Sequence, residues 1–277
     1  MKKLEDGLKR IYLPILVAVA ILWSLFPIYQ LVLVSFTPSG ELLTQLFEIP
    51  KHLTAKFFKS VLFGNDLPWP NMYNSVVVAT LVTVITVTLS VLGGYSFSRW
   101  KSSTSKALFY TILVFRMFPP IITVIPIFLV MQKFALVDTF WGLVLAHIPF
   151  NLPLAIWLMK AFYDSVPIEL EEAAWIDGAS ISQELRKIVL PLVAPGIGVT
   201  AIFMFLDSYI EFLFALTLSR RMVVTMPVKI AGYVIFNDLR YQVMFATVLV
   251  STIPVVILYF LVRKRLLAGL SLSFIKG

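Results

Sequence analysis

Six apolar segments, each long enough to cross a lipid bilayer as one helix, constrain what this chain of 277 residues can fold into. A membrane-spanning helix needs about 20 mostly apolar residues. In lipid, the backbone polar groups must pair within the segment, which a helix achieves. We therefore expect an all-α membrane protein with six transmembrane helices, forming a single transmembrane domain over residues 1–277. The six segments are residues 11–36, 72–98, 107–131, 139–159, 194–218 and 241–262.

Composition supports the same class and excludes several functions. Charged residues make up 14% of the chain, against about 25% in a typical soluble domain. The net charge of +8 does not indicate nucleic-acid binding, because the basic residues flank apolar segments. The chain has no cysteine, and its two histidines, His52 and His147, lie far apart, so we expect no metal site. No phosphate-binding loop motif occurs, so any ATP hydrolysis belongs to another chain, and we expect no catalytic residues here.

The distribution of Lys and Arg predicts how the chain crosses the membrane. With the N-terminus inside, fourteen of the 23 basic residues lie on the inner side and eight on the outer side, and Arg116 lies within a span. Positively charged loops favour the cytoplasm, so we expect both termini there. A loop at residues 160–191 and a tail at residues 263–277 would then be cytoplasmic. The outer loops would be residues 37–71, expected as a short amphipathic excursion at the membrane surface, and residues 219–240, either a solvated connection or a contact with an external protein.

The charged loop at residues 160–191 has the signals of two short helices joined by a turn. Pro167 suits a first helical turn, and acidic residues follow it at the positive end of the helix dipole. Gly178 suits the end of that helix, and we expect a side chain there to be crowded. Ser180 with Gln183 has the pattern of a capping box for the second helix, which we expect Pro191 to end.

The spacing within this loop resembles the EAA loop of ABC importer permeases, the cytoplasmic element on which an ATPase subunit docks. Glu-Ala-Ala is followed after three residues by Gly and after nine more by Ile-x-Leu-Pro. Four matched parts make a specific signal, and the alternative is an ordinary amphipathic loop between membrane helices. The resemblance implies ATPase coupling for Glu172, Ala173, Ala174, Asp177, Gly178, Ile188, Leu190 and Pro191.

Other segments are similar to the carbohydrate-importing branch of these permeases, specifically to the smaller, maltose-permease-type subunit. One departure is Tyr209-Ile210, where the family often has Trp-Asn, and it weakens assignments of substrate contacts in that span. The similar segments are Tyr95-Ser-Phe-Ser-Arg99, Glu211-Phe-Leu-Phe-Ala-Leu-Thr-Leu218, Thr225-Met-Pro-Val228 and, in the tail, Gly269-Leu-Ser and Ile275-Lys-Gly277.

The resemblance implies the fold of a type I ABC importer permease in the cell membrane, in contact with membrane lipid. This chain would pair with a second permease subunit, with two ATPase subunits that bind ATP and magnesium, and with an extracytoplasmic sugar-binding protein. ATP would drive alternating access to a central sugar site. This chain itself would bind no cofactor and no nucleic acid.

A few polar residues within the spans are candidates for a substrate pathway. A charge within a span is costly, so Arg116 indicates an internal structural or gating role or a substrate contact. Asp207 and Glu211 are four residues apart and would share one helix face, as a proton relay, a sugar site or a helix end. His147 and Asn151 suit a pathway or a hydrogen-bonded packing role. The predicted pathway residues are Arg116, His147, Asn151, Tyr209 and Glu211.

Two other functions compete with the importer. A transporter driven by an ion gradient would use paired charges near the membrane midplane, for which Arg116 with Asp207 or Glu211 is a weak candidate. An intramembrane enzyme would need a metal motif or a nucleophile beside its base, and the sequence has neither pattern.

Overall fold

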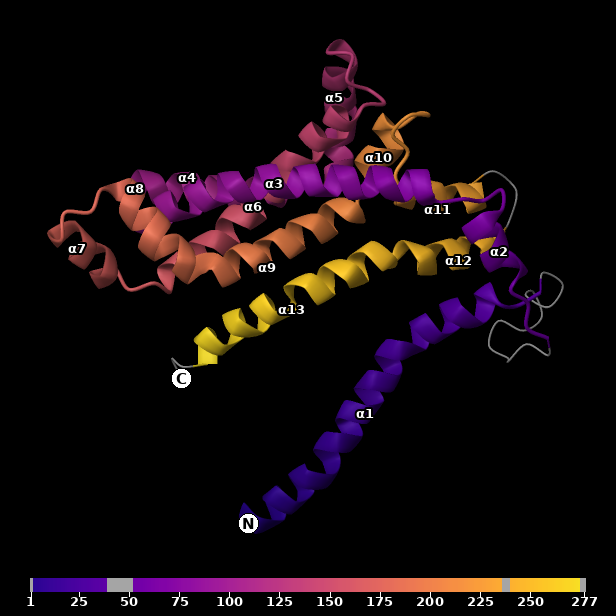
Figure 1. Ribbon diagram of the computed structural model, residues 1–277, viewed down its shortest axis with the longest axis horizontal. Coiled ribbons are helices and arrows are strands. Elements are labelled where there is room, and N and C mark those ends of the chain that lie inside the picture. Colours follow the sequence, from indigo (N-terminus) through magenta and orange to yellow (C-terminus); the bar gives the residue numbers. More distant parts are fainter. Residues whose placement is uncertain (1, 39–51, 236–239, 275–277) are drawn as a thin grey trace. The chain divides into compact units, whose positions relative to one another are not determined.

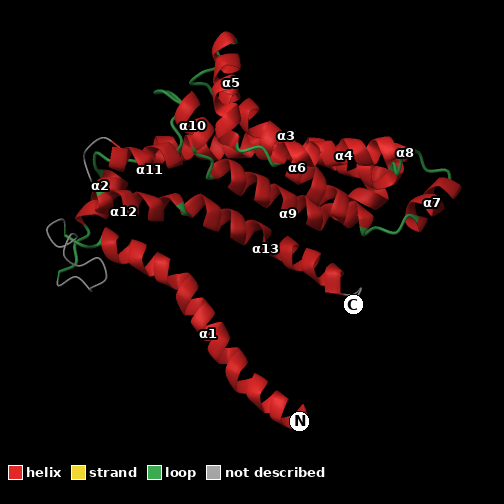
Figure 2. Ribbon diagram, turned by 180° about the vertical axis from the view of Figure 1, so that it is seen from behind, coloured by secondary structure: helices red, strands yellow, loops and turns green. Residues whose placement is uncertain are grey.

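The computed structural model describes residues 2–38, 52–235 and 240–274, and side chains within residues 12–38, 52–234 and 240–263. Every regular element in these ranges is a helix, which confirms the predicted all-α class (Figure 1 and Figure 2). The chain divides into two compact units. Unit 1 comprises Met1–Pro68 with Ile230–Thr252, and unit 2 comprises Trp69–Lys229 with Ile253–Gly277.

Unit 1 contains α1 (Lys2–Ser35), α2 (Lys56–Phe63) and α12 (Tyr241–Ser251), and α12 packs against both of the others. The stretch Tyr12–Ser35 of α1 is long and apolar enough to span a bilayer, and most of its side chains are exposed. An apolar helix with exposed side chains suits contact with lipid or with another subunit.

Within unit 1, an ion pair links the predicted outer loop at residues 37–71 to the residue just before α12. Arg240 donates to both carboxylate oxygens of Asp66, from Nη1 at 2.8 Å and Nη2 at 2.7 Å. Ser60 Oγ in α2 donates to the same carboxylate at 2.6 Å. The described part of this loop is therefore attached to the residue that precedes α12; the rest of the predicted excursion, residues 39–51, lies outside the described residues.

The centre of unit 2 is a layer of three long helices, α3 (Trp69–Arg99), α6 (Phe140–Asp164) and α9 (Leu190–Tyr209), with α13 (Ile253–Phe274) along α9 (Figure 1). All three belong to segments long and apolar enough to span a membrane. The connection from α6 to α9 is the charged loop described below, so the loop joins two neighbouring spans of the layer.

Two glycines set how closely these helices approach. A Cβ at Gly94 of α3 would lie 2.7 Å from the Cβ of Met159, and one at Gly196 of α9 would lie 2.2 Å from the Phe162 ring. Both distances are too short for a side chain, so α3 and α9 contact α6 in a way that only glycine permits.

The third apolar segment, predicted as a span over residues 107–131, is two helices joined at a sharp bend. The helices α4 (Ser103–Arg116) and α5 (Pro120–Lys133) meet at 92°. Pro119 and Pro120 explain the bend, since a residue before proline avoids helical geometry and a proline begins a helix well. Among the described residues, five helices can span a membrane, or six if this bent pair is one span.

The fifth segment is also interrupted, so the prediction of one span over residues 194–218 is wrong at its end. After α9 stops at Tyr209, a new helix, α10 (Leu213–Leu218), begins. The two carboxylate oxygens of Glu211 accept from the N–H groups of Phe214 at 2.9 Å and Ala215 at 3.1 Å. These N–H groups have no partner within a new helix, so Glu211 supplies one.

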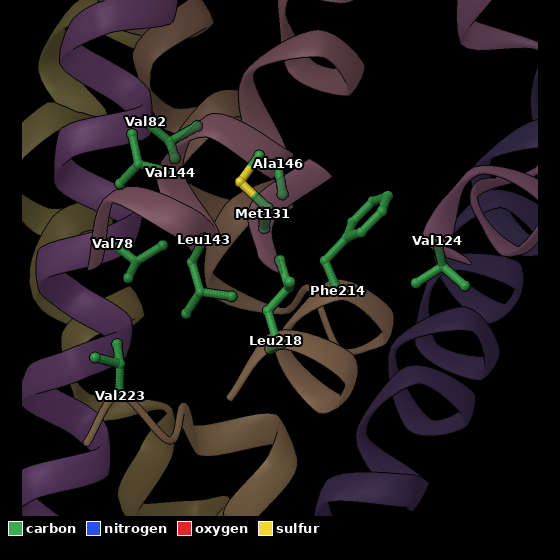
Figure 3. Close-up of a cluster of buried hydrophobic side chains, with 11 residues drawn as sticks. Val78, Val82, Val124, Met131, Leu143, Val144, Ala146, Phe214, Leu218 and Val223 are labelled. Atoms are coloured by element: carbon green, nitrogen blue, oxygen red, sulfur yellow. The ribbon is translucent and has the colours of Figure 1, made fainter. Parts of the chain in front are cut away.

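A cluster of buried side chains holds α5 and α10 against α3 and α6 (Figure 3). Since both α5 and α10 contribute buried side chains to it, the segments after the two breaks are packed parts of the fold. Its members include Val78, Val82, Val124, Met131, Leu143, Val144, Ala146, Phe214, Leu218 and Val223. After α10 the chain continues into α11 (Met226–Ile235).

Candidate functional site

The charged loop between α6 and α9 folds into short helices, as the sequence predicts. They are α7 (Glu169–Ile176) and α8 (Ile181–Glu184), and a π-helical turn, η1 (Leu185–Val189), leads from α8 into α9. Ser180 N donates to Gln183 Oε1 at 2.9 Å and Gln183 N donates to Ser180 Oγ at 3.4 Å, which is the predicted capping box.

The end of the second helix differs from the prediction. Pro191 does not end it, because α8 continues through η1 into α9, and Pro191 lies in the first turn of α9. Proline cannot donate a hydrogen bond to the preceding turn, and here the preceding turn is the π-helical one, where the α-helical pattern is already interrupted. The loop is therefore continuous with a membrane span, and movement of α8 would be passed directly to α9.

Gly178 ends α7 with a φ of +82°, a conformation in which side chains are rare. The expected crowding is absent, since no heavy atom lies within 4 Å of a Cβ built there among the described residues. The requirement for glycine is conformational: the positive φ turns the chain so that α8 can begin.

The last turns of α3 hold the loop through two buried carboxylates. Glu171 in α7 is fully buried, and its Oε1 accepts from Arg99 Nε at 2.8 Å and Nη2 at 2.5 Å. Glu184 in α8 is also fully buried and accepts from Trp175 Nε1 at 3.0 Å. The hydroxyl of Tyr95 lies 3.3 Å from Glu171 and 3.2 Å from Glu184, so it bridges α7 and α8.

Arg99 also fixes the point where the chain leaves α6. Its Nη2 donates to the carbonyl of Val166 at 3.2 Å, and its Nη1 donates to Ser98 Oγ at 3.0 Å. Ser98 in turn donates to Asp164 at 2.6 Å, and Lys160 pairs with the same carboxylate at 2.6 Å. One arginine thus joins α3, the end of α6 and α7.

The residues assigned to ATPase coupling by resemblance fall into two groups. Ala174 is buried against the rest of the loop, and Ile188 and Leu190 are half-buried. The others are exposed and available to a partner: Glu172, Ala173, Asp177, Gly178 and Pro191.

The sequence did not single out Glu171 and Glu184, the two carboxylates through which the charged loop is attached to α3. A weak signal was present. Tyr95 and Arg99 were singled out by their motif with no partner assigned, and Glu171 precedes the small residue Ala174 by one helical turn, which puts the two on one face.

A second site lies at the two helix breaks of unit 2. A cavity of about 350 Å³ opens between α4, α5, α6 and the α9–α10 break. Of the predicted pathway residues, Arg116, His147, Asn151 and Glu211 line it. Tyr209 does not, because its ring packs in a separate apolar cluster with Ala79 and Phe205.

An ion pair and a histidine–carboxylate contact face this cavity. Arg116 Nη1 lies 3.1 Å from Asp207 Oδ2 and also donates to the carbonyl of Phe150. His147 Nε2 lies 3.2 Å from Glu211 Oε2, and its Nδ1 is 2.8 Å from Ser208 Oγ. Asp207 and Glu211 thus reach one cavity although the helix between them breaks.

The side chain of Asn151, which lines the same cavity, has a hydrogen-bond acceptor that is not satisfied by the described residues. Its Nδ2 donates to the carbonyl of His147 at 3.0 Å, and its buried Oδ1 has no hydrogen-bond partner among the described residues. A buried acceptor without a partner is costly unless a ligand or water supplies a donor. In the described part of the chain, no three His, Asp or Glu side chains are placed to hold a metal ion.

A turn before α6 fastens the described start of the 219–240 loop. Asp138, at a φ of +61°, accepts from the backbone N–H groups of Arg220, Arg221, Met222 and Val223 at 2.9–3.1 Å. Burial by itself would raise the pKa of this carboxyl, but the four N–H groups outweigh it and hold the pKa below its usual value. The segment 220–223 is therefore not a loose solvated connection, because its backbone N–H groups are bound by the carboxylate of Asp138.

Residues 86–270 match the family described as binding-protein-dependent transport system inner membrane component. The chain is 33% identical over 277 residues to the trehalose/maltose transport system permease protein MalG of Thermococcus litoralis, and the match covers 99% of each chain. It is 31% identical over 269 residues to the trehalose transport system permease protein SugB of Mycobacterium tuberculosis, covering 96% of this chain and 97% of that one.

A solved structure supports the same fold. It is a bacterial ABC transporter involved in the import of the acidic polysaccharide alginate, and one of its chains matches with a TM-score of 0.74 over 94% of this chain and 97% of that chain, at 23% identity. The resemblance of the EAA-like loop, the helical fold and the matched relatives agree. The chain therefore belongs to the family of binding-protein-dependent transport system inner membrane components and is a multi-pass membrane protein.

Proposed function

We propose that this chain is one permease subunit of an ATP-driven importer that takes up a carbohydrate delivered by an external binding protein. Full-length similarity to two trehalose-type permeases supports the carbohydrate class. The chain contributes half of a translocation path, a second permease subunit the other half, and two ATPase subunits supply the energy.

The observation that carries this proposal is the attachment of the charged loop to the spans. Arg99 and Tyr95 of α3 hold Glu171 and Glu184 of the loop, and the loop is continuous with α6 and α9. A force applied by an ATPase to the exposed face of α7 therefore acts on α3, α6 and α9 together. Glu172 lies on that face, where it would meet a basic group of the ATPase.

The cavity at the helix breaks is the proposed place where a sugar passes. Its volume of about 350 Å³ lies within the common range for small-molecule pockets, roughly 300–1,000 Å³. Its walls offer charged groups, the free acceptor of Asn151, and the rings of Phe150 and Phe214. It belongs to the same helices that the loop holds, so loop movement would alter its shape.

Reconstituted transport tests the proposal. The assembled complex should accumulate a labelled disaccharide only with ATP and a binding protein. Glu172→Lys and Gly178→Val should abolish binding-protein-stimulated ATPase activity while the chain still inserts. Uptake that continues without ATP and collapses with an ion gradient would instead support a secondary transporter that uses the Arg116–Asp207 pair.

A further inference from the structure

A second, larger concavity in unit 2 adjoins the attachment of the charged loop and continues beyond it. It has a volume of about 630 Å³ and lies where α3 ends, α4 begins and the chain leaves α6. Part of its wall is Val166–Glu169, the entry to the charged loop. The candidate membrane span Trp69–Arg99 ends here, and the end of a span is where lipid headgroups are expected.

The charges of this groove are only partly compensated. Its lining holds four basic and two acidic residues. Arg99 is committed to Glu171, and Lys160 to Asp164. The other two basic residues, Lys101 and Lys106, are exposed and form no ion pair with any described residue.

Exposed aromatic side chains line part of the groove. Trp100, directly after α3, is 69% exposed, and Tyr110, in the second turn of α4, is 64% exposed. Phe109, which is buried, also lines the groove, with Lys160 Nζ 5.6 Å from its ring centre. Exposed Trp and Tyr at the end of a span are typical of the interface between headgroups and acyl chains.

We propose that this groove binds the headgroup of an anionic phospholipid, with Lys101 and Lys106 on the phosphate and the acyl chains along Trp100 and Tyr110. Two ammonium groups without an ion-pair partner in the described part of the chain favour an anion, and basic pockets between membrane helices suit anionic headgroups. The exposed aromatic lining distinguishes a lipid from a soluble phosphate, which would gain nothing from it. The bound headgroup contacts the loop entry, so lipid composition would influence the position of the loop.

The test measures lipid binding directly and does not depend on the transported substrate. The full-length chain, with the subunits that accompany it, is placed in nanodiscs of phosphatidylcholine alone or with added phosphatidylglycerol, and retained lipid is identified by native mass spectrometry. The wild type should retain phosphatidylglycerol selectively. Lys101→Gln with Lys106→Gln should lower that affinity roughly thirtyfold, since each basic residue near a lipid surface contributes about a factor of five.

Matched variants distinguish binding at this groove from a general effect of the net charge of the protein on lipid retention. Lys133→Gln at the far end of α5 should leave retention unchanged, and Glu169→Gln, which removes an opposing charge from the same groove, should keep or raise it. Free glycerol phosphate at matched concentration should not displace the lipid. Displacement by glycerol phosphate, or equal retention by wild type and the double lysine variant, would overturn the proposal.

Discussion

The guanidinium of Arg99 contacts one oxygen of the fully buried Glu171 through two nitrogens, at 2.8 and 2.5 Å, across 72 residues of sequence. This pair is the attachment of the charged loop to a membrane span. It gives the Tyr-Ser-Phe-Ser-Arg motif a physical role that the sequence left without a partner: the tyrosine and the arginine both bind carboxylates of the loop.

Arg99→Ala should destabilise the chain by about 3–5 kcal/mol, because it leaves the carboxylate of Glu171 buried without its cation. Thermal unfolding in detergent measures this effect. The double replacement Arg99→Met with Glu171→Met removes both charges and should recover most of the stability, yet the coupling of ATPase activity to the binding protein should stay impaired. Lys133→Ala, outside this network, is the control. An Arg99→Ala chain that unfolds at the wild-type temperature and couples normally would contradict the role given to this pair.

Gly178 should tolerate substitutions according to backbone preference and not according to size. Its φ of +82° costs other residues roughly 1–2 kcal/mol, while no described atom crowds the site. Gly178→Ala and Gly178→Val should therefore impair coupling to a similar degree, and Gly178→Asn, a residue that accepts positive φ more readily, should impair it less. ATPase activity stimulated by the binding protein is the measurement. A graded loss from Ala to Val, with Asn no better than Ala, would point to crowding by a partner subunit instead.

The helical class and the loop pattern could be predicted because each depends on local chemistry: long apolar runs, a capping box and a glycine. The two prolines at 119 and 120 are also a local signal for the bend. The span was predicted from hydropathy alone, and because both sides of the bend are apolar, hydropathy does not show it. The burial of Glu171 and Glu184 could not be predicted, since acidic residues in a charged loop are usually solvated and only Arg99 and Tyr95, distant in sequence, make burial possible. Tyr209 was misplaced because its position on the helix directs it toward Phe205 and away from the cavity.

Asn151→Ala should weaken carbohydrate affinity without disturbing the fold. The unpartnered Oδ1 is offered as an acceptor for a sugar hydroxyl, and losing one such hydrogen bond corresponds to roughly a tenfold change in affinity. The half-saturating sugar concentration for transport should rise by about that factor, with ATPase docking retained. Tyr209→Phe, at a predicted pathway residue that does not line the cavity, is the matched control and should leave this concentration unchanged. Equal effects of the two variants would remove Asn151 from the pathway.

Asp138 should make the turn before α6 sensitive to acid. The folded-state pKa lies below the ordinary value of 3.8, since four backbone N–H groups stabilise the carboxylate against the opposing effect of burial. A lowered pKa means that the unfolded chain binds more protons near that value. The stabilisation is therefore complete well above pH 3.8 and is lost as the pH falls through the lower, folded-state pKa. Asp138→Asn isolates the charge, because asparagine also accepts the φ of +61° at this position. At neutral pH the variant should unfold at a lower temperature than wild type, and this gap should narrow on acidification below pH 3.8. A gap that stays constant across that range would show that the charge of Asp138 does not hold the 220–223 segment.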